Sequence, residues 1–179
     1  MIEIFTPAAA DFEPLWRFNY AVFAAELKMR EAREDQTLID KFHAKNIYFA
    51  ARLTPCGEIV GMISAHWQAP YSAAEHFGDA VTAMPEGGKL AEIRLYAVRA
   101  DYRHTSVAAR LGVAMLSELG RRGIDEVVIS GISNQTPLYE QLGFAVAGEP
   151  VTSGQTTLYP MRADLARVLR RCSRLKRYF

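Results

Sequence analysis

Apolar residues recur along the chain with a helical period in some stretches and with a strand period in others. Residues 2–5 form a short β-prone run. Pro7 and Asp11 then open a predicted helix that continues to about Met29, because apolar residues fall on one of its faces. Those residues are Leu15, Phe18, Val22, Phe23 and Leu27. A dense charge run at 30–35 follows, and a second short helix is predicted over 36–45.

The next stretch predicts a β-hairpin. Apolar runs at 46–53 and 58–67 are joined by Thr54-Pro55-Cys56-Gly57, and turn residues between two such runs are a strong hairpin signal. Residues 70–89 are rich in Ala, Gly and Pro and lack clear periodicity. We therefore expect a loop there, with about one helical turn.

The second half of the chain alternates strands with helices. In order, the predicted elements are a strand at 91–98, a helix at 106–122, a strand at 126–131, a helix at 136–142, strands at 144–146 and 156–159, and a final basic helix at 163–177. Strand–helix–strand pairs require parallel pairing through right-handed crossovers, whereas the early hairpin requires antiparallel pairing. The predicted class is therefore α/β (α+β), with a mixed central sheet of about six or seven strands and helices on both faces.

Composition and charge narrow the class of protein. The chain has 179 residues, 50% of them hydrophobic and 23% charged, which is typical of a single soluble domain over 1–179. A net charge of +1 gives no general basis for binding nucleic acid. The two cysteines and four histidines lack metal-ligand spacing, so no metal site is expected. No apolar run approaches the roughly 20 residues of a membrane span, and the first residues lack the pattern of a signal peptide, so a cytoplasmic protein is expected.

The strand at 91–98 and the helix after it carry the first chemical pattern. A helix that begins just after a strand presents free amides that suit phosphate oxygens, and Arg103 and Arg110 add positive charge. An ordinary loop with a surface arginine explains the same residues. Glu92 and Arg94 lie two apart on the strand and so share a face. Glu92 either relays a proton from an attacking ammonium group or pairs with Arg94.

A second pattern is Asn134-Gln135-Thr136-Pro137-Leu138-Tyr139-Glu140-Gln141-Leu142-Gly143-Phe144. It places Tyr139 early in a short helix at the carboxyl end of a strand, where ligands of open α/β sheets bind. A tyrosine hydroxyl stays protonated at neutral pH and can donate a proton to a leaving thiolate. The alternative is a tyrosine that packs beside Leu138 and Leu142.

Together these two patterns resemble the GNAT superfamily of N-acyltransferases. The family's pattern of Val, then Arg-x-x-Gly-x-Gly/Ala at a helix start, corresponds to Val98 and to Arg103-His104-Thr105-Ser106-Val107-Ala108, with Ser106 where glycine is usual. Its later Asn … Tyr-Glu-x-x-Gly-Phe motif is matched by Asn134, Tyr139, Glu140, Gly143 and Phe144. The resemblance implies a phosphopantetheine thioester as co-substrate and transfer of its acyl group to an amine.

The beginning of the chain resembles one branch of that superfamily, the N-acyl amino acid synthases and acyl-homoserine-lactone synthases. The matching features are the run from Arg17 to Leu27, the aspartates Asp35 and Asp40, an aromatic strand at 47–49, and Glu92, Arg94 and Leu95. Members of this branch usually take long acyl chains from acyl carrier protein. An arginine that often ends the third strand is missing, because Gly61 is followed here by Met62-Ile63-Ser64-Ala65-His66-Trp67.

The resemblance implies a role for each matching residue. The pantetheine arm is expected along Leu95, Tyr96, Ala97 and Val98, and the phosphate at Arg103, His104, Thr105, Ser106, Val107 and Ala108, with Asn134 as a further co-substrate contact. Glu92 is the candidate base, directly or through water, a strand amide holds the oxyanion, and Tyr139 protonates the leaving thiolate. Arg94, Arg17 and Phe23 are assigned to the acceptor, Arg94 either binding its carboxylate or fixing Glu92.

Three functions remain open at this stage. The donor is acyl-CoA or acyl carrier protein, and the acceptor is a small-molecule amine such as an amino acid. The basic stretch at 162–179, with Arg162, Arg167, Arg170, Arg171, Arg174, Lys176 and Arg177, favours an acidic carrier protein or at most peripheral contact with anionic lipid, although a solvated helix has the same composition. The second function is acetyl transfer from acetyl-CoA. The third is a non-catalytic module that binds an acyl thioester or another protein.

Overall fold

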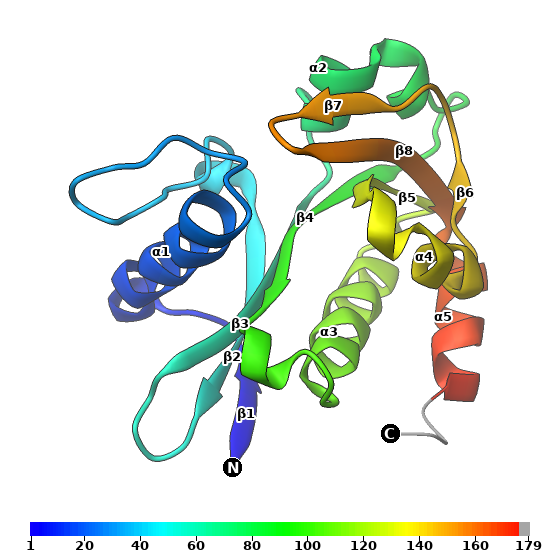
Figure 1. Ribbon diagram of the computed structural model, residues 1–179. Helices are drawn as coiled ribbons and strands as arrows, with labels where there is room; N and C mark the ends of the chain where they lie inside the picture. Colours follow the sequence, from blue (N-terminus) through cyan, green and yellow to red (C-terminus); the bar gives the residue numbers. More distant parts are fainter. Residues whose placement is uncertain (176–179) are drawn as a thin grey trace. The chain divides into compact units, whose positions relative to one another are not determined.

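The fold is built on a mixed β-sheet whose strands are hydrogen-bonded in the order β1-β2-β3-β4-β5-β8-β6, with β7 paired to β8 (Figure 1). The computed structural model describes residues 1–175. The strands are β1 (Ile2–Phe5), β2 (Ile47–Leu53), β3 (Ile59–His66), β4 (Leu90–Val98), β5 (Glu126–Ile132), β6 (Ala145–Val146), β7 (Val151–Ser153) and β8 (Thr156–Asp164). The helices are α1 (Phe12–Tyr20), α2 (Ser72–Phe77), α3 (Val107–Arg121), α4 (Thr136–Leu142) and α5 (Leu165–Leu175).

Strand directions confirm the predicted class. β1, β2 and β3 pair antiparallel, β4 pairs with β5 in parallel, and β5 pairs antiparallel with β8. The described chain has eight strands instead of the six or seven expected. The additional strand, β7, forms a tight hairpin with the start of β8, from Ser153↔Thr156 to Val151↔Leu158.

The chain divides into two compact units, each made of two separate stretches. The first comprises Met1–Ala65 and Leu95–Met115, and the second comprises His66–Arg94 and the chain from Leu116 onward. β4 and α3 therefore each contribute residues to both units. The single domain predicted over 1–179 stays a prediction.

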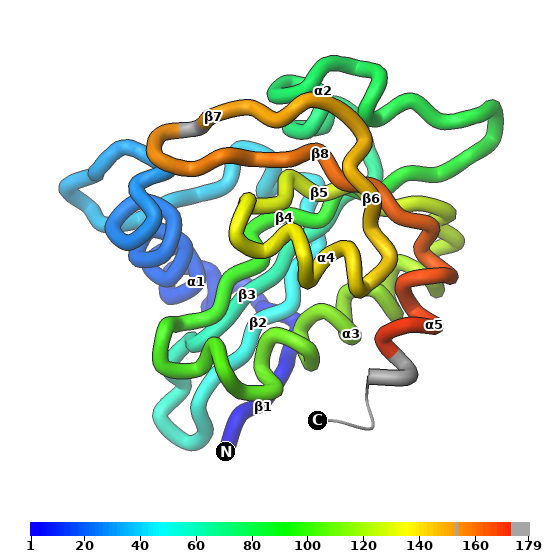
Figure 2. The backbone as a smooth tube through the Cα atoms, turned by 45° about the vertical axis from the view of Figure 1, so that its right-hand side comes forward, coloured from blue at the N-terminus to red at the C-terminus, as the bar shows by residue number. Residues whose placement is uncertain are grey.

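In the first unit, α1 packs on β2 and β3 (Figure 2). Leu15, Phe18 and Val22 lie on one helical face, as the spacing predicted, and they form a core cluster with Tyr48 and Met62. The helical path continues past α1 as a π-helical turn at Ala21–Glu26. A wider turn of this kind is often found at functional sites.

The helix predicted over 36–45 is wrong. The described structure there is irregular apart from a single 3₁₀ turn at His43–Lys45. Asp35 accepts a hydrogen bond from the Thr37 amide at 3.2 Å, and Asp40 accepts one from the Phe42 amide at 2.9 Å. Aspartate side chains that bind the amide two residues ahead offer the backbone an alternative to a helix, which explains the failure.

In the second unit, β8 runs further than predicted. It continues through Pro160 to Asp164, although proline is unusual in an interior strand. β7 pairs with β8 as far as Leu158, and β6 pairs with it at Met161 and Arg162. Pro160 lies between these two pairings, and its carbonyl accepts a hydrogen bond from the Ala147 amide at 2.8 Å. A missing N–H is therefore tolerated at this position.

Two more predictions about the second unit need correction. Residues 70–89, expected to be a loop with one helical turn, contain α2 and a 3₁₀ turn at Asp79–Thr82. The basic C-terminal helix begins at Leu165, where Asp164 accepts a hydrogen bond from the Arg167 amide at 2.6 Å. Arg162 is thus a strand residue. Lys176 and Arg177 lie outside the described residues.

Within residues 1–175, none of the helices has the length and apolar character needed to cross a membrane.

Candidate active site

Glu92 lies on β4 with its carboxylate buried. Its Oε1 accepts hydrogen bonds from the Ser72 hydroxyl at 2.6 Å and the Ala73 amide at 2.8 Å. Its Oε2 accepts from the Ser72 amide at 2.9 Å and contacts His66 Nε2 at 3.1 Å. Ser72 and Ala73 are the first residues of α2, so the carboxylate caps the start of that helix.

The charge state of Glu92 follows from these contacts. Burial by itself raises the pKa of the carboxyl, but the hydrogen bonds from His66 and Ser72, together with the positive charge of Arg94, outweigh burial and lower the pKa below its ordinary value. Glu92 is therefore ionised at neutral pH. Because the carboxylate is charged, we assign its contact with His66 as a hydrogen bond donated by Nε2–H.

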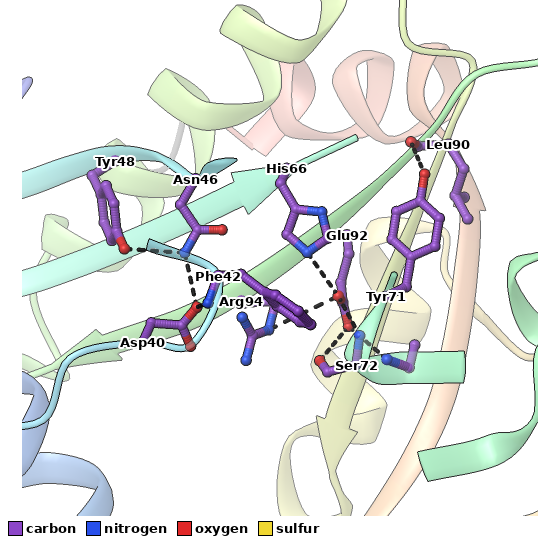
Figure 3. Close-up of polar contacts among 11 residues, drawn as sticks. Asp40, Phe42, Asn46, Tyr48, His66, Tyr71, Ser72, Leu90, Glu92 and Arg94 are labelled. Carbon is purple, nitrogen blue, oxygen red and sulfur yellow. Dashed lines mark hydrogen bonds and ion pairs between the residues drawn. The ribbon is translucent and has the colours of Figure 1, made fainter. Parts of the chain in front are cut away.

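Arg94 and Tyr71 complete the surroundings of this carboxylate (Figure 3). The Arg94 side chain is only 8% exposed, and its Nε lies 3.9 Å from Glu92 Oε2. Tyr71 stacks on the His66 ring with centroids 5.4 Å apart and donates a hydrogen bond to the Leu90 carbonyl at 3.2 Å. Burial and the negative charge of Glu92 raise the pKa of Tyr71, so its hydroxyl stays a donor.

Tyr139 lies on the short helix α4 and is half-buried. Its ring lies against the backbone of Gly131 on β5, where a Cβ would be 3.3 Å from Tyr139 Cδ2 and 2.9 Å from Met161 Sδ. It contacts the Phe144 ring edge-on, with centroids 6.0 Å apart. Burial raises the pKa of Tyr139 above its ordinary value, so the phenol is protonated at neutral pH and can act as a proton donor.

In the first unit, the predicted co-substrate residues meet at the beginning of α3. Ser106 precedes the helix, and its carbonyl accepts the Arg110 amide at 2.9 Å. Thr105 Oγ1 accepts a long hydrogen bond from the Val107 amide at 3.4 Å. The Tyr96 hydroxyl donates to the Ala108 carbonyl at 2.5 Å, so its side chain is used to hold β4 against this turn. Anions bind at such helix starts.

The second half of β4 is irregular. Leu95 has a φ of 51°, which is uncommon for any residue other than glycine and rare for a leucine in a strand. Ala97 and Val98 are buried, so only their backbone groups remain for a ligand. An outlier of this kind is a reason to suspect function.

Arg103, predicted to face the phosphate, is already paired. Its Nε donates to the Val98 carbonyl at 3.0 Å, and its Nη2 donates to Glu26 at 2.6 Å. Glu26 belongs to the π-helical turn that follows α1. A phosphate would therefore compete with Glu26 for this guanidinium. His104 is exposed beside it.

The residues assigned to the acceptor do not share one environment. Arg17 lines a surface pocket of about 320 Å³ with Tyr20, Ala21, Ala25 and Gln36. Its guanidinium forms an exposed ion pair with Glu13 at 2.9 Å, which contributes little and is readily exchanged. Phe23 instead packs against the core cluster of the first unit.

Asn134 lies exposed in the 3₁₀ turn between β5 and α4. Among residues 1–175, no group of three or more His, Cys, Asp or Glu side chains is arranged to hold a metal ion.

The sequence did not point to His66, Tyr71 or Ser72 as partners of Glu92. A histidine at the end of the apolar run 58–67 was the available signal, because a polar residue in a buried strand needs a specific partner. Ser72 gave no comparable signal, since α2 has no clear periodicity.

Known acyltransferases share this fold. BjaI, a CoA-dependent acyl-homoserine lactone synthase solved with SAM and isopentyl-CoA, matches with a TM-score of 0.76 and 18% identity over 97% of this chain and 88% of its own. FeeM, an N-acyl amino acid synthase from uncultured soil microbes, matches with a TM-score of 0.74 and 18% identity over 94% of this chain and 93% of its own. An acetyltransferase of the GNAT family from Staphylococcus aureus Mu50 matches with a TM-score of 0.62 and 14% identity, covering 92% and 99% of the two chains. The protein thus has the GNAT-like acyltransferase fold.

The sequence of the chain also matches a known protein family. The family model described as N-acyl amino acid synthase FeeM matches residues 15–164. The chain therefore belongs to the FeeM family of N-acyl amino acid synthases and is an N-acyltransferase, which confirms the resemblance and the enzyme class inferred from the sequence. No curated protein matches the chain.

Proposed function

We propose that the protein transfers a medium or long acyl chain from a phosphopantetheine thioester to the amino group of an amino acid. The observation that carries this proposal is the family match over 15–164, which includes both Glu92 and Tyr139. The reaction forms the new C–N bond and breaks the C–S bond of the thioester. One proton leaves the acceptor ammonium before attack, a second leaves the same nitrogen as the tetrahedral intermediate collapses to the amide, and one proton is taken up by the departing thiolate.

The donor is assigned to the first unit. The phosphate of the pantetheine arm binds the amides at the beginning of α3, and Arg103 turns from Glu26 to the phosphate when the donor arrives. The pantetheine arm forms backbone hydrogen bonds along Leu95–Val98, and a strand amide holds the oxyanion. The irregular φ of Leu95 supports this assignment, because it bends the strand where the ligand is expected.

Deprotonation of the acceptor is assigned to Glu92 acting through His66. Direct transfer is unfavourable, because the hydrogen bonds from His66 and Ser72 and the charge of Arg94 lower the pKa of the Glu92 carboxyl below its ordinary value and so make it a weaker base. Both carboxylate oxygens are also occupied by the donors of α2 and His66. The His66 ring, which the carboxylate holds through Nε2, is the neighbouring group that can accept a proton instead. We propose that His66 accepts the proton through a water molecule while Glu92 stabilises the imidazolium.

Tyr139 supplies the proton to the thiolate and recovers one from solvent. Arg17 binds the acceptor carboxylate in the pocket beside Tyr20 and Gln36, because an exposed guanidinium can exchange Glu13 for a substrate carboxylate. Arg94 holds Glu92 in place.

The decisive experiment offers the purified enzyme acyl-CoA and acyl carrier protein donors from C2 to C16, with the common amino acids as acceptors, and identifies products by mass spectrometry. The expected result is an N-acyl amino acid formed faster from a long-chain donor than from acetyl-CoA. Tyr139→Phe and His66→Gln are each expected to lower kcat by about 100-fold.

Other outcomes would replace the proposal. Transfer from acetyl-CoA alone would establish an N-acetyltransferase. Binding of a thioester without transfer to any amine would establish a non-catalytic module.

A further inference from the structure

The C-terminal helix α5 contacts α4, the helix that carries Tyr139 (Figures 1 and 2). Arg171 Nη1 donates hydrogen bonds to the Glu140 carbonyl at 3.1 Å and to the Gln141 carbonyl at 2.9 Å. These carbonyls belong to the last turn of α4, whose carbonyls lack the regular helical donors four residues ahead. The Glu140 carbonyl also accepts the Gly143 amide at 2.9 Å. At least one arginine of the basic C-terminal stretch, Arg171, thus contacts another helix of the protein.

The turn after α4 is shaped around the same arginine. Gly143 ends the helix with a φ of 105°, and a Cβ there would be 3.4 Å from Arg171 Cδ and 3.5 Å from Arg167 Cγ. The Phe144 amide then donates to the Tyr139 carbonyl at 3.0 Å. Arg171 therefore contacts the turn at Gly143 and Phe144, and the backbone of this turn is hydrogen-bonded to the backbone of Tyr139.

α4 needs such support because it has only seven residues. A helix of this length is not stable by its own hydrogen bonds, so tertiary contacts determine where it lies. A cation at the carboxyl end also interacts favourably with the helix dipole. α5 is itself firmly anchored, with Leu165 and Val168 buried and its start capped by Asp164.

We propose that Arg171 is a positioning residue that holds α4, and through it the Tyr139 hydroxyl, in place for protonation of the leaving thiolate. This inference rests on the proposed function of Tyr139. It gives part of the basic C-terminal stretch a role in supporting the active site, in place of the carrier-protein contact that its composition suggested.

The first test compares two donors that differ only in the acidity of the leaving thiol. An acyl-CoA releases an alkyl thiolate that needs a proton, whereas an acyl ester of thionitrobenzoate releases a stable thiolate that does not. With acyl-CoA, Arg171→Ala is expected to lower kcat about 10-fold and Tyr139→Phe about 100-fold. With the aryl thioester, the kcat of both variants is expected to approach the kcat of the wild-type enzyme with that same donor. Equal losses with both donors would overturn the proposal.

A double-mutant cycle and a matched control sharpen this test. If Arg171 acts through Tyr139, the double variant Tyr139→Phe/Arg171→Ala is no slower than Tyr139→Phe alone. Additive losses would contradict the coupling. With acyl-CoA as the donor, which requires no carrier-protein contact, Arg170→Ala removes the same charge from an exposed neighbouring position on α5 and is expected to retain the wild-type kcat. Arg171→Lys, which keeps one donor, is expected to recover part of the loss.

A second measurement does not depend on turnover. Titration of ¹³Cζ-labelled tyrosine by NMR, with Tyr139 assigned by its absence in Tyr139→Phe, reports the environment of the phenol directly. Arg171→Ala is expected to lower the pKa of Tyr139 toward its ordinary value of about 10, because a displaced α4 exposes the ring. An unchanged pKa would overturn the positioning role. If wild type transfers no acyl group from any donor, the proposed function fails, and this titration still decides whether Arg171 positions Tyr139.

Discussion

Glu92 is a buried carboxylate that accepts four hydrogen bonds, three of them from Ser72 and Ala73 and one from His66. A group held in this way stabilises the folded protein only while it is ionised. Because its pKa is lowered in the folded state, the stabilisation is present above the unfolded pKa of about 4.3 and is lost as pH falls through the lower folded value.

Glu92→Gln is expected to lower the free energy of unfolding at pH 7 by about 1–3 kcal/mol, because an amide NH₂ would face the donors of α2. The difference from wild type should narrow as pH falls below about 4. Urea denaturation at several pH values measures it. Glu149→Gln, at an exposed position, is the control and should leave stability unchanged. A pH-independent difference would mean that the charge of Glu92 is not the source of the effect.

Glu26 forms an ion pair with the guanidinium of Arg103, the group that the donor phosphate is expected to bind. Glu26→Gln weakens the ion pair and removes a negative charge from the phosphate site, so the KM for acyl-CoA is expected to fall about 3- to 10-fold with kcat little changed. Steady-state kinetics test this. Glu58→Gln removes one of the two carboxylate partners of Arg99, the other being Asp101, and should leave KM unaltered. An unchanged or higher KM in Glu26→Gln would argue against phosphate binding at Arg103.

For single residues, the sequence indicated which side chains are candidates for catalysis or binding, but not which neighbours position them. Glu92 and Arg94 were expected to share a face, and they are in contact. His66 and Ser72 come from segments 26 and 20 residues away in the chain, and no local periodicity relates them to Glu92. Arg103 was identified by its motif, but its pairing with Glu26 depends on a segment 77 residues distant.

Among the elements, α4 shows most clearly how a short helix depends on its neighbours. The Tyr139 ring of α4 packs against Gly131, and the absence of a side chain on Gly131 permits this close approach. Gly131→Ala is expected to displace Tyr139 and lower kcat about 10-fold with acyl-CoA, because a methyl group there would overlap Met161 and crowd the ring.

The control for that substitution is Gly120→Ala on α3, where an added Cβ meets only an ordinary contact with Leu169 at 3.4 Å. Gly120 lies in the last turn of α3, where the preference for alanine over glycine is smaller than the roughly 1 kcal/mol of a helix interior, so this variant should be equally active and at least as stable. Thermal denaturation and kcat measured together separate the two variants. If Gly131→Ala keeps full activity, the packing of Tyr139 on β5 is not required for catalysis.

Elements with strong periodicity were predicted within a residue or two, as for α3 and α4. The failures have physical causes. Asp35 and Asp40 bind their own local amides, which removed the helix expected over 36–45. β8 continued past Pro160 because that residue lies between two pairing partners, a fact that depends on the sheet and not on the strand's own sequence.

For the whole molecule, binding of the donor is expected to raise stability by mass action. At a free concentration 100-fold above Kd, a ligand specific for the folded state adds about 2.7 kcal/mol. Lauroyl-CoA or lauroyl carrier protein should therefore raise Tm more than acetyl-CoA at equal concentration. Differential scanning fluorimetry without an acceptor measures this. Equal shifts for lauroyl-CoA and acetyl-CoA would show that the protein does not recognise the acyl chain.

The interleaved composition of the two units has a consequence for synthesis on the ribosome. The first core cluster joins α1, β2 and β3 with Leu95 and Ala97, which are translated 29 and 31 residues after His66, the last residue of the hairpin. A nascent chain that ends at residue 90 has its early helix and hairpin but not the strand that completes their core. Its apolar surfaces remain exposed until β4 and the start of α3 have left the exit tunnel, so a pause in translation between residues 66 and 95 would favour aggregation or chaperone binding.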